Sequence, residues 1–153
     1  MSSKRVLILY YSGGGNTKKM AKAIAEAVKS CAISVAVEDA GKFDISSLPK
    51  YDAIVLGSPT YFSNVAWQIK KVIDESIVHY GGDKLKGKVA GIFASAGTSR
   101  DGKDCLKMLE VALGFHHGMK VVQSLLRVDG ENDKEVKKKC QEYGKKLVKE
   151  IEK

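Results

Sequence analysis

The residues best suited to bind a ligand form a glycine-rich segment, Ser12-Gly13-Gly14-Gly15-Asn16-Thr17, between an apolar run and a helical pattern. Glycines let backbone N–H groups converge on one point, and the N-terminus of a helix adds partial positive charge. The ligand that suits such a segment is a phosphate group. A glycine-rich turn that only connects a strand to a helix is the alternative interpretation.

Two common phosphate motifs do not match this segment. A P-loop needs Gly-Lys-Ser/Thr at the start of the helix, where this chain has Asn16-Thr17-Lys18. A dinucleotide-binding fingerprint is favoured by Glu38 and Asp39, which end the second apolar run at about the distance of a ribose-binding acid. Its glycine spacing fails, however, because a fingerprint that starts at Gly13 would place Lys18 where helix and strand need a glycine to pack closely. Nucleotide hydrolysis and dinucleotide binding therefore lose their main support.

A second segment, Gly57-Ser58-Pro59-Thr60-Tyr61-Phe62-Ser63-Asn64, places two adjacent aromatic residues at the end of a strand. Large rings that face solvent are costly unless something flat covers them, so a planar ring system is a suitable ligand for Tyr61 and Phe62. The alternative is that both rings pack on the protein's own core. A third segment of mostly small and polar residues, 95–102, follows another apolar run.

Apolar runs and helical patterns alternate along the whole chain, without a Pro-rich, Ser-rich or low-complexity linker. We predict strands at 5–11, 33–37, 53–56, 88–95 and 120–128, and helices around 20–28, 45–48, 66–78, 104–115 and 134–152. Apolar strands that alternate with helices form a parallel sheet covered on both faces. The fold class is therefore α/β, a doubly wound three-layer sandwich, and residues 1–153 form one domain. Ligands of such sheets bind beyond the carboxyl ends of the strands, where the three segments lie.

The composition excludes several classes of protein. With 44% hydrophobic residues among 153, the chain is neither disordered nor a fibrous repeat. Its formal net charge of +8 comes almost wholly from lysine, since the chain has only three arginines. In the predicted C-terminal helix the lysines alternate with acids, which is typical of a solvated helix face. We therefore expect no nucleic acid as a partner.

The cysteine spacing indicates whether the chain has disulfides or a metal site, and the hydropathy indicates whether it enters a membrane. Cys31, Cys105 and Cys140 form no Cys-x-x-Cys pair and have no histidine at ligand spacing. We expect buried, reduced thiols, with neither a disulfide framework nor a metal site. The chain starts without a signal-peptide pattern, and no window approaches about 18 apolar residues. We therefore expect a cytoplasmic protein that does not enter a membrane.

Four segments together resemble one superfamily. Residues 12–17 resemble the phosphate loop of flavodoxins, Ser/Thr-x-Thr-Gly-Asn-Thr, with Gly14 where that family has a hydroxyl. The second segment is similar to the Pro-Thr-x-Phe-Gly-Asn stretch of the WrbA family, the flavodoxin-like NAD(P)H:quinone oxidoreductases, with Ser63 in place of the glycine. Ser95-Ala96-Gly97-Thr98 and His116-His117-Gly118-Met119 also resemble the WrbA family. The four matches span nearly the whole chain in the expected order.

The resemblance implies a five-stranded parallel sheet in the order 2-1-3-4-5 and a non-covalently bound FMN. It implies that Ser12, Asn16 and Thr17 hold the phosphate, with the isoalloxazine ring between the second and third segments. By the same comparison His117 approaches the pyrimidine edge of the ring as the candidate catalytic residue; the alternative is that it caps a helix that ends at Gly118. The full set implied to bind FMN is Ser12, Gly13, Gly14, Gly15, Asn16, Thr17, Pro59, Thr60, Tyr61, Phe62, Ser63, Asn64, Ser95, Ala96, Gly97, Thr98, Ser99, Gly102 and His117.

Charge near the ring bears on what the flavin does. A low-potential carrier typically surrounds its flavin with acidic residues and aromatic shields, whereas this chain is basic and has Arg100 in the third segment. A positive charge about 5 Å from the reduced ring would raise the flavin potential by roughly 140 mV. An open ring face would also let a nicotinamide or a quinone stack on it.

Two roles for the flavin remain after these comparisons. The main expectation is a flavodoxin-type FMN protein that exchanges electrons with a redox partner protein, as a monomer or small homo-oligomer. The alternative is an NAD(P)H-dependent quinone reductase, although the chain has no room for the insertions with which the WrbA family forms its tetramer and completes its active site. A flavin-free interaction module on the same fold is a third reading, because a fold alone does not establish a function.

Overall fold

The apolar runs of the sequence form the strands of one central sheet in the computed structural model, which describes residues 3–153. The strands are β1 (Arg5–Tyr10), β2 (Ser34–Asp39), β3 (Ala53–Tyr61), β4 (Asn64–Val65), β5 (Val89–Ala96), β6 (Lys120–Val121) and β7 (Leu125–Val128). The α-helices are α1 (Asn16–Lys29), α2 (Trp67–Glu75), α3 (Ile77–Tyr80), α4 (Ser99–Glu110) and α5 (Asp133–Ile151). Two 3₁₀ turns span Ala40–Lys42 and Ile45–Lys50, and a π-helix at Val111–His116 continues α4.

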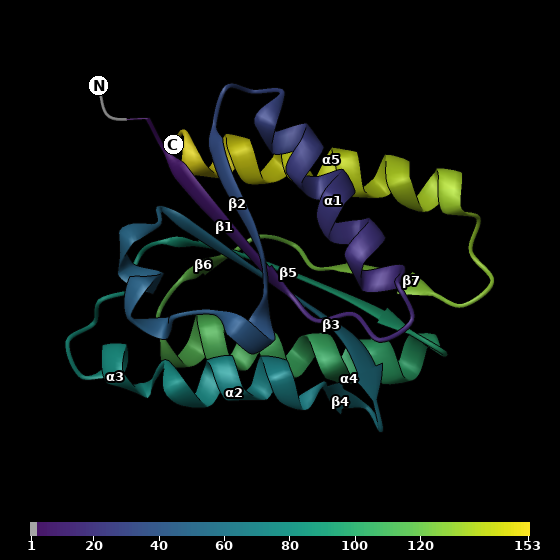
Figure 1. The fold of residues 1–153 in the computed structure, drawn as a ribbon, viewed down its shortest axis with the longest axis horizontal. Coiled ribbons are helices and arrows are strands. Elements are labelled where there is room, and N and C mark those ends of the chain that lie inside the picture. The colour runs from purple at the N-terminus through teal and green to yellow at the C-terminus, as the bar shows by residue number, and fades with distance from the viewer. Residues whose placement is uncertain (1–2) are drawn as a thin grey trace.

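The strand order matches the one that the flavodoxin resemblance implies. Neighbouring strands lie in the order β2-β1-β3-β5, and both β6 and β7 then pair with β5. All of these pairings are parallel. Helices α1 and α5 cover one face of the sheet, and α2, α3 and α4 cover the other (Figure 1). The α/β sandwich with strand order 2-1-3-4-5 is confirmed, with β6 and β7 sharing the fifth position.

Strand β1 shows why the sheet needs helices on both faces. Successive side chains of a strand point to opposite faces, so a run without polar residues is apolar on both. Val6 and Ile8 are buried in the core that α1 and α5 cover, whereas Leu7 and Leu9 are buried in the core that α2 and α4 cover. The two cores hold the sheet rigidly, and they therefore also fix the relative positions of the loops at its edge.

The helices α1 and α5 approach each other closely at Gly144. A Cβ atom at Gly144 would lie 2.7 Å from the Cβ of Ala27 and 2.9 Å from the carbonyl oxygen of Ile24. The neighbouring Tyr143 binds the sheet, because its hydroxyl accepts a hydrogen bond of 2.9 Å from the backbone N–H of Ile92. Burial raises the pKa of this phenol. These contacts join the two helices to β5 in the C-terminal half of α5.

Several element boundaries differ from the predicted ones. Strand β3 runs to Tyr61 instead of residue 56, because its extension pairs first with β5 and then with β4. Helix α4 starts at Ser99, before the expected residue 104, because the Thr98 hydroxyl caps its first turn. The predicted helix 66–78 divides into α2 and α3, and the predicted strand 120–128 divides into β6 and β7. The first two differences arise because a neighbouring strand or a cap extends an element beyond its apolar residues.

The three cysteines are free thiols, but they differ in burial. Cys105 and Cys140 are buried as expected, whereas Cys31 is exposed in the turn that follows α1, so that expectation is wrong for Cys31. Burial raises the pKa of the Cys140 thiol to about 11. Within residues 3–153, no helix is long and apolar enough to cross a bilayer, and no cluster of three or more His, Cys, Asp or Glu side chains is arranged to hold a metal ion.

Candidate functional site

Three loops meet at the carboxyl edge of the sheet. Strands β1, β3 and β5 are parallel neighbours, with Tyr10 paired to Gly57 and Pro59 paired to Ser95. Parallel strands end at the same edge, so the loops that follow them lie side by side, as the right-hand side of Figure 1 shows. We name them the glycine loop (residues 12–15), the aromatic hairpin (residues 58–65) and the β5–α4 loop (residues 97–98).

Ser12 shapes the glycine loop. Its Oγ accepts hydrogen bonds from the backbone N–H of Gly15 (3.0 Å) and of Lys18 (3.3 Å), which joins the loop to the first turn of α1. Gly15 has a φ of 101°, a conformation that glycine adopts at little cost. Within residues 3–153, the backbone N–H groups of Asn16 and Thr17 have no acceptor. They form, with the helix dipole, a cradle for an anion.

The side chain of Thr17 belongs to the scaffold below this cradle. It is 1% exposed, and its Oγ1 lies 2.9 Å from the Oγ of Ser95. The two hydroxyl groups form a buried hydrogen bond between residues that are 78 positions apart, and this bond ties the start of α1 to the end of β5. Thr17 therefore offers an approaching anion its backbone N–H, while its hydroxyl holds two loops together.

The aromatic hairpin ends in a two-residue turn. Strands β3 and β4 pair antiparallel with Tyr61 opposite Asn64, which leaves Phe62 and Ser63 as the turn. Their φ values of 52° and 63° are both positive, as a type I′ hairpin turn requires. Such values are uncommon for residues with a side chain, so other contacts must hold the turn. One of them is the hydrogen bond of 2.8 Å that the Ser63 hydroxyl donates to Oδ1 of Asp101 in α4.

The rings of the hairpin do not fold back into the core. Phe62 is fully exposed, Tyr61 is 45% exposed, and Trp67, at the start of α2 just after the hairpin, is 69% exposed. The Tyr61 hydroxyl lies against the glycine loop, because a Cβ atom at Gly13 would come within 2.5 Å of it. Glycine at position 13 therefore allows the hairpin and the glycine loop to touch, and a flat apolar surface remains open to a ligand.

The β5–α4 loop presents exposed polar groups on the other side of the hairpin. Gly97, Thr98, Ser99 and Arg100 are all exposed. The Oγ1 of Thr98 accepts a hydrogen bond of 3.2 Å from the backbone N–H of Asp101, and so caps α4. The loop therefore faces the hairpin with a capped helix N-terminus and one arginine.

Some of the residues predicted to contact FMN are buried beneath the loops. Pro59, Ser95, Ala96 and Gly102 are buried. A Cβ atom at Gly102 would lie 2.4 Å from Cδ1 of Leu126 and 3.0 Å from the Cβ of Ala96. Gly102 therefore lets α4 pack closely on β5 and β7, and its contact with the flavin stays a prediction.

His117 lies at the opposite edge of the sheet from the three loops. It follows the π-helix that carries α4 away from the β5–α4 loop, and its neighbour Gly118 accepts a hydrogen bond of 3.0 Å from the N–H of Gly87, close to the start of β5. Within one chain His117 therefore lies away from the three loops, and its approach to the flavin stays a prediction. A helix end at Gly118, whose φ is 71°, agrees with the alternative interpretation.

The surroundings of His117 favour its neutral form. Its Nε2 lies 2.9 Å from the Oγ of Ser76, and burial lowers the pKa of the imidazole, with smaller contributions from His79 and His116. A charged His117 that stabilises a helix dipole is thus not supported.

Two residues at the loop edge were not among the predicted site residues. Asp101 anchors the aromatic hairpin through Ser63, and Trp67 adds a third exposed ring beside it. The pattern Thr98-x-x-Asp101 resembles a helix capping signal, which would have placed Asp101 in the first turn of α4. For Trp67 the sequence offers no local signal, because an aromatic residue at a helix start is buried as readily as it is exposed.

Comparisons with known proteins agree with this geometry. The family model described as a flavodoxin domain matches residues 7–149. The chain belongs to the flavodoxin family. A flavodoxin from the domain Archaea superposes with a TM-score of 0.84 and 25% identity, over 97% of this chain and 99% of that one. A WrbA-like flavodoxin from Agrobacterium tumefaciens shares the fold, with a TM-score of 0.82 and 24% identity over 97% and 98% of the two chains.

Longer proteins are also similar to this chain in sequence. An NAD(P)H dehydrogenase (quinone) from Paracoccus denitrificans is 34% identical over 76% of this chain and 66% of its own length. NAD(P)H dehydrogenase (quinone) 3 from Rhizobium meliloti is 31% identical over 77% of this chain and 65% of its own length. This flavodoxin-family chain therefore spans about two thirds of the length of the curated relatives it matches.

Membership of this family makes the protein an FMN-binding redox flavoprotein, and the loops fit that cofactor. The N–H groups at the start of α1 match a phosphate, and the exposed rings of the aromatic hairpin match the flat isoalloxazine. When bound, FMN supplies the transfer of electrons. The protein's own residues contribute the anion cradle, a flat apolar surface and the rigid spacing between them.

Proposed function

We propose that the protein is a flavodoxin-type electron carrier that exchanges electrons with a redox partner protein at the carboxyl edge of its sheet. The observation that carries this proposal is the aromatic hairpin, which presents the fully exposed Phe62 next to Tyr61 on a turn anchored by Ser63 and Asp101. Trp67 is also exposed, at the start of α2. An exposed ring on an anchored turn suits contact with another protein, because aromatic residues bury much area at little entropic cost. The full-length similarity to an archaeal flavodoxin supports the same role.

The proposed cofactor contacts follow from the exposed part of the site. The N–H groups of Asn16 and Thr17 hold the FMN phosphate, within a loop that Ser12 shapes. The ring lies between the aromatic hairpin and the β5–α4 loop, near the exposed residues Tyr61, Phe62, Asn64, Gly97, Thr98 and Ser99. The buried residues Pro59, Ser95, Ala96 and Gly102 act beneath them as scaffold.

A second function is favoured by the quinone-dehydrogenase names of the relatives. In this reading the protein is an NAD(P)H-dependent quinone reductase, in which a nicotinamide and then a quinone stack on the open ring face. The identity of 31–34% to those relatives supports it. Each of these relatives matches this chain over only 65–66% of its own length.

An anaerobic reduction of the FMN-loaded protein separates the two functions. NADH and NADPH are added first, then dithionite, and visible spectra record the oxidation state of the flavin. We expect slow or no bleaching by either nucleotide and stepwise reduction by dithionite in two one-electron stages. Rapid bleaching by a nucleotide would replace the carrier with the reductase, and failure to retain FMN would overturn both.

We also propose that residues 1–153 work as one domain in the cytoplasm, as a monomer or small homo-oligomer. The three free thiols support a reducing compartment, where cysteines stay unpaired. Sedimentation of the FMN-loaded protein measures the oligomeric state directly. A dimer or monomer agrees with this proposal, whereas a large assembly contradicts it.

A further inference from the structure

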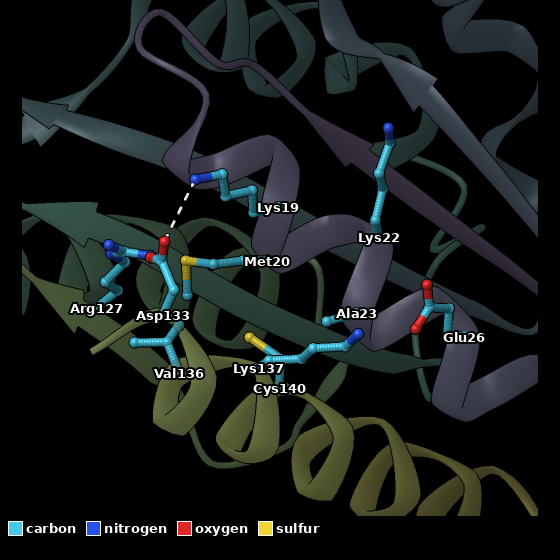
Figure 2. A pocket seen from close by; sticks show the side chains of 10 residues that line it. All are labelled: Lys19, Met20, Lys22, Ala23, Glu26, Arg127, Asp133, Val136, Lys137 and Cys140. Carbon is cyan, nitrogen blue, oxygen red and sulfur yellow. Dashed lines mark ion pairs between the residues drawn. The ribbon is translucent and has the colours of Figure 1, made fainter. Parts of the chain in front are cut away.

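A cavity of about 270 Å³ opens between α1 and α5, on the face of the sheet away from the aromatic hairpin. Its apolar lining comes from Met20 and Ala23 of α1 and from Val136 and Cys140 of α5. Figure 2 shows these side chains between the two helices, with charged groups around them. The helices touch closely at Gly144, and the cavity lies between residues 19–26 of α1 and 133–140 of α5.

The charged groups around the cavity are mostly basic. Lys19, Lys22, Lys137 and Arg127 line it together with two acids, Glu26 and Asp133. Lys19 and Arg127 converge on Asp133 at one end (Figure 2). The excess of positive charge beside an apolar floor favours an anion that also carries an apolar body.

Arg127 is the unusual member of this group, because it is nine-tenths buried. It lies on β7 opposite Ser95 of β5, and its Nη1 forms an ion pair with Oδ1 of Asp133 at 2.6 Å. Its Nε is buried and has no hydrogen-bond partner within residues 3–153. A guanidinium has five N–H donors, so one carboxylate leaves this buried cation short of acceptors.

Asp133 is a solvent-exposed partner for such a buried cation. Its side chain is 62% exposed, and its carboxylate is shared with Lys19 at 3.5 Å. The hydrogen bond from Arg127 and the charge of Lys19 lower the pKa of Asp133, which shows that both cations act on one anionic position. An external carboxylate at that position would meet the same two cations and could add acceptors for the remaining N–H groups.

We propose that this cavity binds a small organic carboxylate with an aromatic or branched apolar body. The carboxylate contacts Lys19 and Arg127 beside Asp133, and the body packs on Met20, Ala23, Val136 and Cys140. The volume suits a body of one or two rings, because it lies just below the usual range for drug-sized ligands. The site is independent of the flavin function proposed above, although Lys19 stands only one turn beyond the glycine loop and donates its N–H to the Gly15 carbonyl at 3.1 Å.

The test uses the FMN-loaded protein and 2-naphthoate as the probe. Backbone amide chemical shifts are followed by NMR during titration with 2-naphthoate, with neutral 2-naphthylmethanol and with inorganic phosphate. We expect saturable shifts along α1 and α5 for 2-naphthoate only. Equal binding of the neutral alcohol would overturn the role of Lys19 and Arg127, and equal shifts with phosphate would overturn the role of the apolar floor.

Three variants locate the probe. Ala23→Leu fills the cavity and should abolish the shifts, while Lys19→Gln should weaken binding about threefold, as expected for a partly exposed charge. Lys145→Gln is the matched control, an exposed lysine on α5 outside the cavity lining, and should leave binding unchanged. Unaltered binding in Ala23→Leu would place the probe elsewhere and overturn the proposal. Flavin absorbance, recorded throughout, should show retained FMN in all three variants, so a failed carrier function and a failed cavity site are told apart.

Discussion

The loop edge of the sheet has a buried layer and an exposed layer, and the same three segments contribute to both. In the buried layer, Thr17 bonds to Ser95 and Gly102 packs against Leu126. In the exposed layer, Tyr61 and Phe62 face solvent beside the N–H groups that start α1. Buried and exposed residues of the same segment thus have different roles. The buried residues set the spacing of the loops, and the exposed residues contact the ligand.

We expect the largest loss of stability from Gly57→Ala, at the residue directly before the aromatic hairpin. A Cβ atom at Gly57 would lie 2.0 Å from the buried Phe93 ring, which cannot move without disturbing the core. We expect a loss of about 3 kcal/mol in the free energy of unfolding, measured by urea denaturation. Gly14→Ala is the control, because nothing lies within 4 Å of a Cβ atom there, and it should change stability by less than about 0.5 kcal/mol. Similar losses in both variants would contradict the division into layers.

Thr17→Val tests whether the buried hydroxyl belongs to the scaffold. It removes the hydrogen bond to Ser95 and leaves that hydroxyl without its partner, so unfolding should become easier by about 1–2 kcal/mol. FMN affinity, measured by flavin fluorescence quenching, should fall much less than in a variant that disrupts Ser12. A double variant of Thr17→Val with Ser95→Ala should cost less than the sum of the two changes. If affinity falls steeply while stability is unchanged, the Thr17 hydroxyl serves the ligand after all.

Tyr61→Ala tests the exposed layer. We expect FMN affinity to fall about fivefold and the flavin spectrum or midpoint potential to shift, because a stacked aromatic pair contributes about 1 kcal/mol. Stability should change little, since Tyr61 is 45% exposed. Tyr80→Ala is the control, because Tyr80 is exposed to the same extent but lies in α3, at the edge near His117. An unchanged flavin in Tyr61→Ala would remove this ring from the site.

We expect the smallest change in stability from His117→Gln, at the opposite edge of the sheet. Burial lowers the pKa of His117 below its ordinary value of 6.5. The unfolded chain then binds more protons between the two pKa values, so the stabilisation from neutral His117 is full above the unfolded pKa and is lost as the pH falls through the folded one. The urea midpoint should therefore fall between pH 7 and pH 5, and His117→Gln should reduce that slope. The flavin potential should be the same in the unsubstituted protein and in His117→Gln. A different potential would show that His117 acts on the flavin.

Most of the scaffold was predictable from the sequence, because its signals are local. An apolar run such as Val6-Leu7-Ile8-Leu9 indicates a strand buried on both faces wherever it occurs, and the glycines before Asn16 mark a helix start that can receive an anion. The boundaries of α4 were less predictable, because its first turn is solvent-facing and depends on the Thr98 cap.

The candidate site was predictable as three segments but not residue by residue. Tyr61 and Gly13 lie 48 positions apart, and their contact depends on the register between β1 and β3. The hydrogen bond between Ser63 and Asp101 depends likewise on where α4 starts relative to β3. A motif that matches a family, such as His116-His117-Gly118-Met119, indicates that the segment is present but not which edge of the sheet it occupies.

Local signals in the sequence were enough to predict the layer order, the family and the chemistry of the glycine loop, because hydrophobic periodicity and glycine conformation act over a few neighbouring residues. The folded arrangement was needed to show that the Thr17 hydroxyl is buried, that His117 lies at the far edge of the sheet and that Arg127 lines a cavity between two helices. Each of these depends on packing between segments far apart in the chain, where burial and hydrogen-bond partners come from strand register and helix length.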